Sequence, residues 1–281
     1  MYLFKYFEPA RTDVIKNGCI RLTQPLDFND PFEFKPVIST VATQEEFKDI
    51  FEKTIHEKIE EELSKIPLEL AEKISKQDLE ATIRQLLNDN KGKLDAHLAN
   101  TAKQVSNIYN EKSNELIGVL CLTEEKDNLL MWSHYADSHK GFCIKFDASH
   151  EFFNQRRSEN DEFYHLREVV YLDERPNKTM SNMSGVDLLL LKSDIWAYEK
   201  EWRFCGVLND SDYIIDSEPL NVHLFKFPKS IIQEIILGVN ASSQLEQEMK
   251  LIISQTHELS HVKLSKTKIS EKHYSLEFND L

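Results

Sequence analysis

The chain has few of the residues that mark linkers, zinc sites or membrane spans. Its 281 residues include only 7 glycines and 8 prolines, which argues against long disordered linkers. The four cysteines are isolated, with no C-x-x-C pair, so we expect buried free thiols in a reducing compartment rather than a zinc site. No apolar run approaches the roughly 20 residues that span a bilayer, and the N-terminus lacks the pattern of a secretory signal. The sequence therefore predicts a soluble, cytoplasmic protein.

Positive charge is also scarce. Lys and Arg number 34 against 48 Asp and Glu, which gives a formal net charge of −14. An acidic surface repels phosphate backbones and anionic lipids, so we expect neither general nucleic-acid binding nor membrane-surface binding. A local basic pocket stays compatible with this charge, and the sequence leaves the oligomeric state open.

Strand-like patterns dominate both ends of the sequence. Apolar runs and period-two alternation predict strands at 2–7, 19–23, 117–122, 142–146, 169–171, 201–208, 222–227, 231–238, 262–264 and 274–278. A helical turn at 11–17 ends at Gly18, and a late helix covers 242–257. Strands that pair over long distances, with helices set apart, predict an α+β fold with a mixed or antiparallel sheet core.

The middle of the chain has a different pattern. Thr43 to Glu46 form a capping box, and apolar residues at a spacing of four follow as far as Leu63. Pro67 ends this helix, a second begins near Ser75, and Asn90-Lys91-Gly92 separates it from a third. We therefore expect a single domain over 1–281 whose sheet core, 1–40 and 116–281, is interrupted by a helical insertion at about 41–115. The insertion is expected to contribute partner recognition or a lid, with the chemistry in the sheet core.

Three segments mix aromatic and polar residues. In the first, 28–33, Asn29 and Asp30 precede a proline, which favours a turn that either is purely structural or presents both side chains to a site. The second, 130–141, predicts a helix with Trp132 and Tyr135 on one face. His134 or Tyr135 could serve a ligand or catalysis, or His134 could simply contact neighbouring backbone. We expect no metal site there, because the histidines and Asp137 do not share one face.

The third segment, 196–204, carries a charged face. If a strand begins by Glu199, then Glu199, Glu201 and Arg203 point to one side and Trp202 and Phe204 to the core. Such a face is either a salt-bridge network or a binding site. Because all three tryptophans lie in the second and third segments, we expect them to meet around one core or cleft. The polar residues predicted to converge on that cleft are Asn29, Asp30, His134, Tyr135, Glu199, Glu201 and Arg203.

The order of these motifs resembles the bacterial family called domain of unknown function 2971. The resemblance rests on Lys5-Tyr6, on the segment 28–33, on Met131 to Asp137 with His139-Lys140-Gly141, on Lys192, Trp196 and Tyr198 to Arg203, and on 235–238. It implies no activity. It does imply a phage-defence or toxin context.

A second, more distant resemblance is to ADP-ribosyltransferases. The short first strand, the helix closing at Gly18, the strand ending at Thr23 and the late Glu-x-Glu strand are similar to that superfamily. The resemblance implies NAD as cofactor, Glu201 as the glutamate that stabilises an oxocarbenium-like transition state, and Glu199 as the residue that orients the acceptor. The residues expected to contact the cofactor are Lys5, Tyr6, Arg21, Thr23, Asn29, Asp30, Trp132 and Arg203, with Tyr135 and His134 beside the catalytic pair.

Two other functions fit the same residues. A non-catalytic module could bind a nucleotide or another anionic ligand through Arg203, His134 and Lys140, with the tryptophans as a stacking platform. A nuclease-type toxin could instead hold Mg²⁺ with carboxylates from Asp30, Glu33, Glu199 and Glu201.

Overall fold

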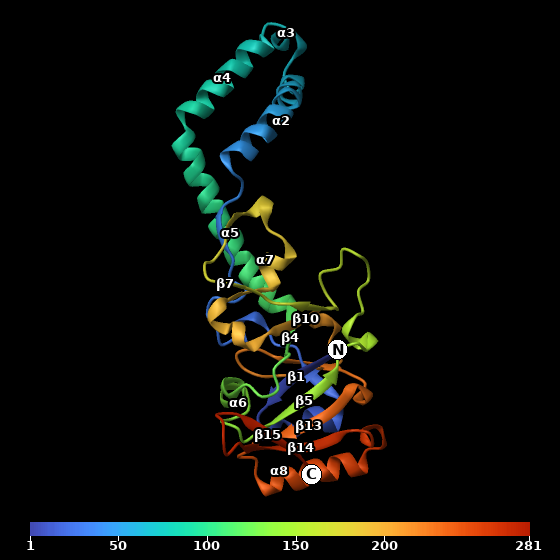
Figure 1. Ribbon diagram of the computed structural model, residues 1–281. Coiled ribbons are helices and arrows are strands. Elements are labelled where there is room, and N and C mark those ends of the chain that lie inside the picture. The colour runs from blue at the N-terminus through green and yellow to red at the C-terminus, as the bar shows by residue number, and fades with distance from the viewer. The chain divides into compact units, whose positions relative to one another are not determined.

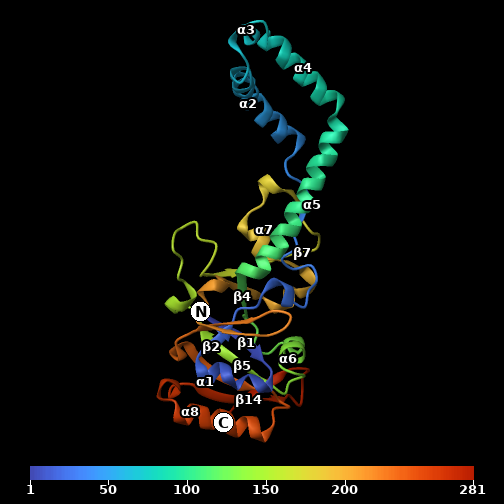
Figure 2. The same ribbon diagram turned by 180° about the vertical axis from the view of Figure 1, so that it is seen from behind.

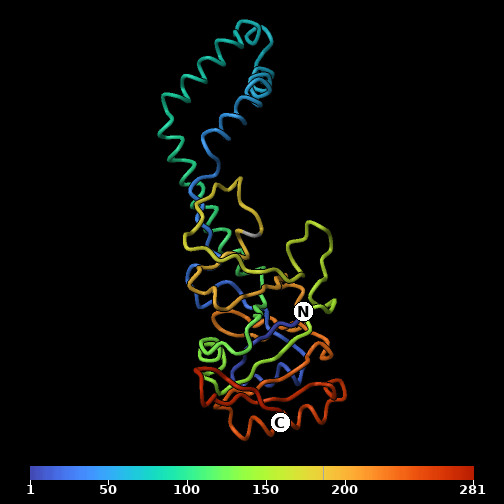
Figure 3. The backbone as a smooth tube through the Cα atoms, in the orientation of Figure 1, coloured from blue at the N-terminus to red at the C-terminus, as the bar shows by residue number. Residues whose placement is uncertain are grey.

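The computed structural model describes residues 1–185 and 187–281, and its backbone is traced in Figure 3. The chain divides into two compact units. The sheet unit comprises Met1–Phe34, Glu111–Glu174 and Gly185–Leu281, and the helical unit comprises Lys35–Asn110 and Arg175–Ser184. None of the helices in the described residues is both long enough and apolar enough to cross a membrane.

A mixed sheet forms the centre of the sheet unit (Figure 1). Among the described residues it has eight strands, in the order β15-β14-β13-β5-β1-β4-β10-β6. All neighbours are antiparallel except β13 and β14, which are parallel. The strands are β1 (Tyr2–Phe7), β4 (Ile117–Thr123), β5 (Phe142–Asp147), β6 (Leu166–Glu168), β10 (Glu201–Val207), β13 (Ile232–Leu237), β14 (Lys263–Ile269) and β15 (Leu276–Asp280). This arrangement confirms the predicted α+β fold.

Each face of the sheet buries its own apolar cluster. Along β1, Leu3 and Phe7 enter the large core on one face, while Phe4 and Tyr6 pack on the other. The large core is closed by α1 (Asp13–Asn17) and by α8 (Ser243–Gln255), which contributes Leu245, Met249 and Ile252 (Figure 2). The opposite face is covered by α6 (Leu129–Tyr135). Because both faces are covered, β5 is buried on both sides, and Cys143 is as buried as Phe142.

Shorter elements complete the sheet unit. A three-stranded sheet joins β2 (Cys19–Arg21), β12 (Val222–Lys226) and β11 (Tyr213–Ile215), and a parallel pair joins β7 (Val170–Leu172) to β9 (Leu191–Ser193). Between the chain's return at Gly185 and β10 lie α7 (Gly185–Leu189) and the 3-10 helix η5 (Asp194–Glu199). At the end of α1, Gly18 adopts a left-handed conformation with φ of 61°, as the sequence predicts for a helix stop.

The helical unit follows the predicted helix boundaries closely. Its helices are α2 (Gln44–Ser64), α3 (Leu68–Ala71), α4 (Lys76–Asp89) and the first part of α5 (Lys91–Leu116), and its two strands, β3 (Val37–Thr40) and β8 (Asn177–Thr179), pair in parallel. The predicted capping box is confirmed: the Thr43 hydroxyl accepts from the Glu46 amide, and the Glu46 carboxylate accepts from the Thr43 amide. At the start of α4 the Ser75 hydroxyl accepts from the amide of Asp78, without a reciprocal bond.

The expectation that the three tryptophans meet is wrong. Trp132 is fully buried in the cluster under α6, where Tyr198 also packs, and Trp196 lies near Tyr198. Trp202 instead packs against the large core on the other face of the sheet. The alternation of β10 sends Trp202 to the face of Phe204, so these side chains cannot share a cleft with Trp132.

Replacing Gly141 should destabilise the sheet unit strongly. A Cβ atom at this position would lie 1.9 Å from the carbonyl oxygen of Phe7, a backbone atom of a central strand that cannot move aside cheaply. We expect Gly141→Ala to lower the free energy of unfolding by about 3 kcal/mol, measured by urea denaturation. Gly92→Ala is the matched control: a Cβ there meets nothing within 4 Å, and alanine should stabilise α5 by up to about 1 kcal/mol. Equal effects of the two changes would contradict this packing argument.

Candidate functional site

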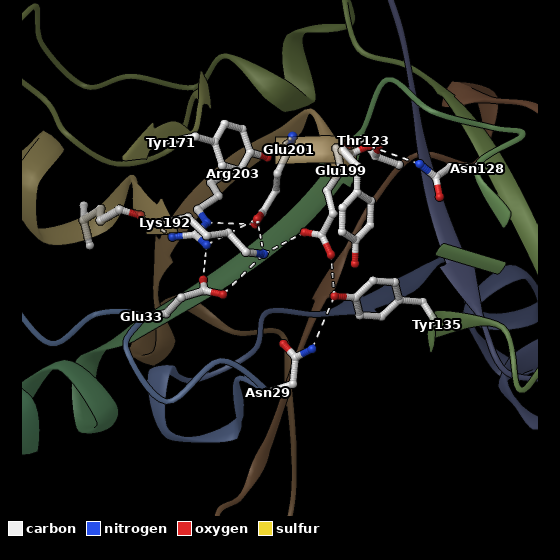
Figure 4. A network of polar contacts seen from close by, with 12 residues as sticks. Asn29, Glu33, Thr123, Asn128, Tyr135, Tyr171, Lys192, Glu199, Glu201 and Arg203 are labelled. Atoms are coloured by element: carbon white, nitrogen blue, oxygen red, sulfur yellow. Dashed lines mark hydrogen bonds and ion pairs between the residues drawn. The ribbon is translucent and has the colours of Figure 1, made fainter. Parts of the chain in front are cut away.

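Five charged side chains are buried together on the α6-covered side of the sheet. Glu33, Lys192, Glu199, Glu201 and Arg203, here called the Lys192 cluster, are each at most 7% exposed, and Arg203 is completely buried. Figure 4 shows them converging from separate segments of the sheet unit. Burying charges is costly unless they are paired, so the contacts within the cluster decide whether it is stable.

Lys192 lies at the centre of the cluster. Its Nζ atom is 2.7 Å from Glu199 Oε2, 2.8 Å from Glu201 Oε2 and 3.3 Å from Glu33 Oε1. The ammonium also lies over the ring of Trp196, 5.2 Å from its centroid. One lysine thus joins three carboxylates from a loop, a 3-10 helix and a strand.

Arg203 supplies the second positive charge. Its Nε donates to Glu201 Oε1 at 2.8 Å, and one terminal nitrogen donates to Glu33 Oε2. The other terminal nitrogen donates to the carbonyl oxygen of Leu189 at 2.8 Å, and the guanidinium lies 4.9 Å from the centroid of the Phe34 ring. The fork of the guanidinium therefore satisfies two carboxylates and a main-chain carbonyl at once.

The backbone brings Glu199 and Glu201 to the same place by different means. Glu201 begins β10 and pairs with Thr123 of β4, whereas Glu199 ends the 3-10 helix η5. Between them Lys200 is left-handed, with φ of 42°, and this turns the chain from helix to strand. The Thr123 hydroxyl donates to the Glu199 carbonyl and so fixes η5 to β4.

The structure shows how far the charged face of this segment extends. The strand begins at Glu201, as the predicted range 201–208 has it, so the condition that it begin by Glu199 is not met and Glu199 lies in η5. Glu201 is 4% exposed and Arg203 is 0% exposed, so this face is enclosed. Alternation places Glu201 and Arg203 on one face correctly, because the period of a strand is two; it does not reveal what covers that face.

The charges of the cluster shift the pKa values of its carboxyl groups in opposite directions. Burial raises the pKa of Glu201, but the charges of Arg203 and Lys192 outweigh burial and lower it to about 2. Burial also raises the pKa of Glu33, and there the same two cations do not compensate fully. Glu201 is therefore ionised at neutral pH, whereas Glu33 loses its proton at a higher pH than an ordinary glutamate does.

A pocket of about 390 Å³ lies beside the cluster within the sheet unit. Part of its wall is apolar, formed by Phe4, Phe28, Leu122 and Met131. The rest is polar and is lined by Lys5, Tyr6, Thr23, Asp27, Asn29, Cys121, Thr123, His134, Tyr135, Lys192, Glu199 and Glu201. The volume falls in the usual range of small-molecule sites, and the mixture of an apolar wall with convergent polar groups is typical of them.

Tyr135 connects the pocket wall to the cluster. Its hydroxyl donates to Glu199 Oε1 at 2.6 Å and accepts from Asn29 Nδ2 at 3.4 Å (Figure 4). Burial raises the pKa of the Tyr135 phenol, and the Glu199 carboxylate raises it further, so the hydroxyl stays protonated. Glu199 is thereby held between a hydroxyl donor and the Lys192 ammonium.

Lys5 is the second lysine of the pocket. Its ammonium donates to the carbonyl oxygen of Cys121 at 3.1 Å, next to the single position where β1 and β4 pair. Burial lowers the pKa of Lys5 below its ordinary value, although Glu201 opposes the shift. A lysine amine in a pocket wall can bind an anionic group or give up a proton more readily than a surface lysine.

Eight of the twelve predicted site residues line this pocket, and four do not. Lys5, Tyr6, Thr23, Asn29, His134, Tyr135, Glu199 and Glu201 are lining residues. Arg203 lies behind Glu201, Trp132 is buried under α6, and Arg21 pairs with Asp27 at the rim. Asp30 is buried in its turn, where Oδ1 accepts from the amide of Phe32, as the structural interpretation of that turn predicts.

The sequence interpretation missed three members of the site. Lys192, which holds the cluster together, was noted only as part of a family motif, and Glu33 only as a metal ligand. Tyr171 was not considered; its hydroxyl accepts from the Glu201 amide at 2.8 Å. Lys192 could have been found, because a lysine that directly follows the apolar run Leu188–Leu191 must either end the strand or be buried with a partner.

The opposite pKa shifts predict different costs for two conservative substitutions. Glutamine resembles a protonated glutamate, and the pKa of Glu33 is raised, so Glu33→Gln should lower the free energy of unfolding at neutral pH by less than Glu201→Gln does. Glu201→Gln removes an ionised partner from two buried cations and should cost about 3 kcal/mol or more. Urea denaturation of both variants measures the difference. Equal costs would mean that Glu33 is ionised as well.

The pH dependence gives a second check on the same pair. The pKa of Glu201 is lowered on folding, so its contribution is present above the unfolded value of about 4.3 and is lost as the pH falls towards about 2. The pKa of Glu33 is raised on folding, so its contribution is present below about 4.3 and is lost as the pH rises through the folded value. The loss of unfolding free energy caused by Glu201→Gln should therefore become smaller in acid. The loss caused by Glu33→Gln should become smaller as the pH rises.

Comparison with known proteins bears on this part of the chain. No curated protein and no solved structure matches the sequence. One family model matches residues 131–204, the stretch from α6 to β10 that carries His134, Tyr135, Lys192, Glu199, Glu201 and Arg203. The match confirms the resemblance predicted from the sequence, and over these residues the chain is similar to the family described as Protein of unknown function (DUF2971).

Proposed function

We propose that the pocket binds NAD or a closely related nucleotide and that the chain is an ADP-ribosyltransferase-like enzyme, acting in the phage-defence or toxin context that the resemblance implies. The observation that carries this proposal is the pair of carboxylates on one pocket wall, of which Glu201 is held ionised by Arg203 and Lys192. A fixed negative charge beside a ligand pocket is what a reaction with a cationic transition state requires.

The chemistry would proceed at the bond between ribose and nicotinamide. As this C–N bond breaks, its electron pair leaves with nicotinamide and positive charge develops on the anomeric carbon. The Glu201 carboxylate would stabilise that charge, and an acceptor hydroxyl, amine or water would form the new bond and release a proton. Glu199 would orient the acceptor through the remaining lone pairs of its oxygens, of which Oε1 accepts from the Tyr135 hydroxyl and Oε2 accepts from Lys192.

The two kinds of pocket wall suit the two parts of such a ligand. Phe4, Phe28 and Met131 offer an apolar surface against which a planar ring can stack. The carboxylates of Glu199 and Glu201 accept hydrogen bonds, which ribose hydroxyls donate. At about 390 Å³ the pocket lies near the lower end of ligand sites, so it fits the nicotinamide riboside half better than a whole dinucleotide.

A non-catalytic binding module is the second candidate, and Lys5 favours it. The Lys5 ammonium lines the pocket and could bind a phosphate or carboxylate without any reaction. The magnesium-dependent nuclease has less support, because Glu33, Glu199 and Glu201 already bind Lys192 and Arg203. The described residues also contain no group of three or more His, Cys, Asp or Glu side chains arranged to hold a metal ion.

The test pairs NAD binding with nicotinamide release. Wild-type protein should bind NAD in isothermal titration calorimetry and release nicotinamide, followed by chromatography. Glu199→Gln removes a buried partner of Lys192, so circular dichroism must first show that the variant is folded. The folded variant should lower turnover by about 100-fold or more. Tyr135→Phe should lower it by less, because it removes only a hydroxyl that donates to Glu199. Glu168→Gln, an exposed glutamate on the neighbouring strand β6, is the matched control and should not alter turnover.

The outcomes separate the candidates. Binding of NAD that both pocket variants weaken, with no nicotinamide released by any protein, supports the binding module and rules out the enzyme. Absence of both binding and turnover in folded wild-type protein overturns the NAD proposal. Glu201→Gln is a weaker probe, because the loss of a buried partner charge would lower stability and function together.

A further inference from the structure

The helical unit buries little apolar surface of its own. In α2 only Ile55 and Ile59 are buried, and none of the residues of α3 and α4 is buried. Large apolar side chains remain exposed on the same helices, among them Ile50 at 57% and Leu86 at 56%. Helices of this length gain most of their stability from packing an apolar face, so this unit lacks a partner surface.

A groove between the helices is lined by other apolar side chains, while Ile50 and Leu86 lie outside it. Its volume is about 420 Å³, and all of its lining residues belong to the helical unit. The apolar part of the lining comes from Phe47 and Phe51 of α2, Leu87 of α4, and Leu94 and Leu98 of α5. Phe47 and Phe51, like Leu94 and Leu98, are four residues apart, which is the spacing of side chains that receive a further helix.

The helices around this groove differ in the sign of their net charge. α2 carries eight acidic and three basic side chains, whereas residues 91–110 of α5 carry three basic and one acidic. The rim of the groove itself is balanced, with Glu45, Glu52 and Asp95 against Lys48, Arg84 and Lys91. Two copies related by a two-fold axis can place the acidic α2 of each against the basic part of α5 of the other.

We propose that the groove is a homodimer interface, in which helices α2, α4 and α5 of two copies pack together as an antiparallel bundle. The two-fold arrangement buries Phe51, Leu94 and their neighbours. It also forms the contact between the acidic α2 and the basic part of α5 twice, once in each half of the interface. Nucleic acid would be repelled by the acidic α2. A second copy fits better because the complementary surface is present on this chain.

The first experiment measures the oligomeric state of the full chain. Sedimentation velocity over a concentration series should show a dimer for the wild type. Phe51→Glu and Leu94→Glu place a charge in the groove and should weaken dimerisation by about tenfold or more. Leu68→Glu makes the same kind of change at an α3 side chain that is 73% exposed and outside the groove, and should have no effect. Circular dichroism confirms that each variant keeps its helix content.

A charge-reversal experiment tests the interface without disturbing its apolar residues. One variant carries Glu45→Lys and Asp49→Lys on α2, and another carries Lys91→Glu and Lys103→Glu on α5. At the substituted positions each variant alone places like charges opposite each other in both halves of the interface, and it should dimerise at least about tenfold more weakly than the wild type. An equimolar mixture should recover a heterodimer, because the substituted lysines then face the substituted glutamates in one half and the wild-type charges face each other in the other half.

Two results would overturn the proposal. One is a wild-type protein that stays monomeric at its highest soluble concentration. The other is a dimer that persists unchanged in both groove variants and in both charge-reversal variants, since its interface would then lie elsewhere on the chain. Neither result would bear on the function proposed for the pocket, because all of the pocket's lining residues belong to the sheet unit.

Discussion

The contact between the Lys192 ammonium and three carboxylates determines the geometry of the candidate site. Lys192 comes from β9, whereas Glu33, Glu199 and Glu201 come from a loop, a 3-10 helix and the first residue of a sheet strand. Without a cation between them, three buried carboxylates would repel one another and open the pocket wall. Arg203 also binds Glu33 and Glu201. Positive charges of the protein itself therefore hold these carboxylates in place, whether or not a ligand is bound.

The sheet can hold such a cluster because one of its faces carries the apolar core and the other carries the charged groups. One face carries an uninterrupted apolar core from β1, β4, β5, β10 and β13, closed by α1 and α8. This core supplies the stability that the charged face does not, since buried ion pairs contribute little net stability once their desolvation is counted. On the other face the apolar side chains form two separate clusters, one with Trp132 and one with Phe34, and charged groups occupy part of the same face.

Sequence patterns located the elements of this fold better than the environment of the site. Alternation identified β10, and capping residues identified α2 and α4, because backbone geometry and local hydrogen bonds depend on neighbouring residues. The same alternation left open whether Glu201 and Arg203 belong to a salt-bridge network or to a binding site. Their complete burial depends on Lys192 and Glu33, which are 9 and 168 residues away from Glu201. Contacts over such separations leave no periodic signal, so alternation pointed to Glu201 and Arg203 but not to their partners Lys192 and Glu33.

The cluster also lies at two of the points where the chain passes between its units. Glu33 is the second-last residue before the chain leaves the sheet unit, and Leu189, whose carbonyl accepts from Arg203, follows the return at Gly185 by four residues. Arg203 therefore holds the departing and the returning segments with one guanidinium. Any displacement of Glu33 would remove a partner from Arg203 and Lys192 and change the field at Glu201. The electrostatic state of the pocket thus depends on how these two connections are held, although no pocket-lining residue belongs to the helical unit.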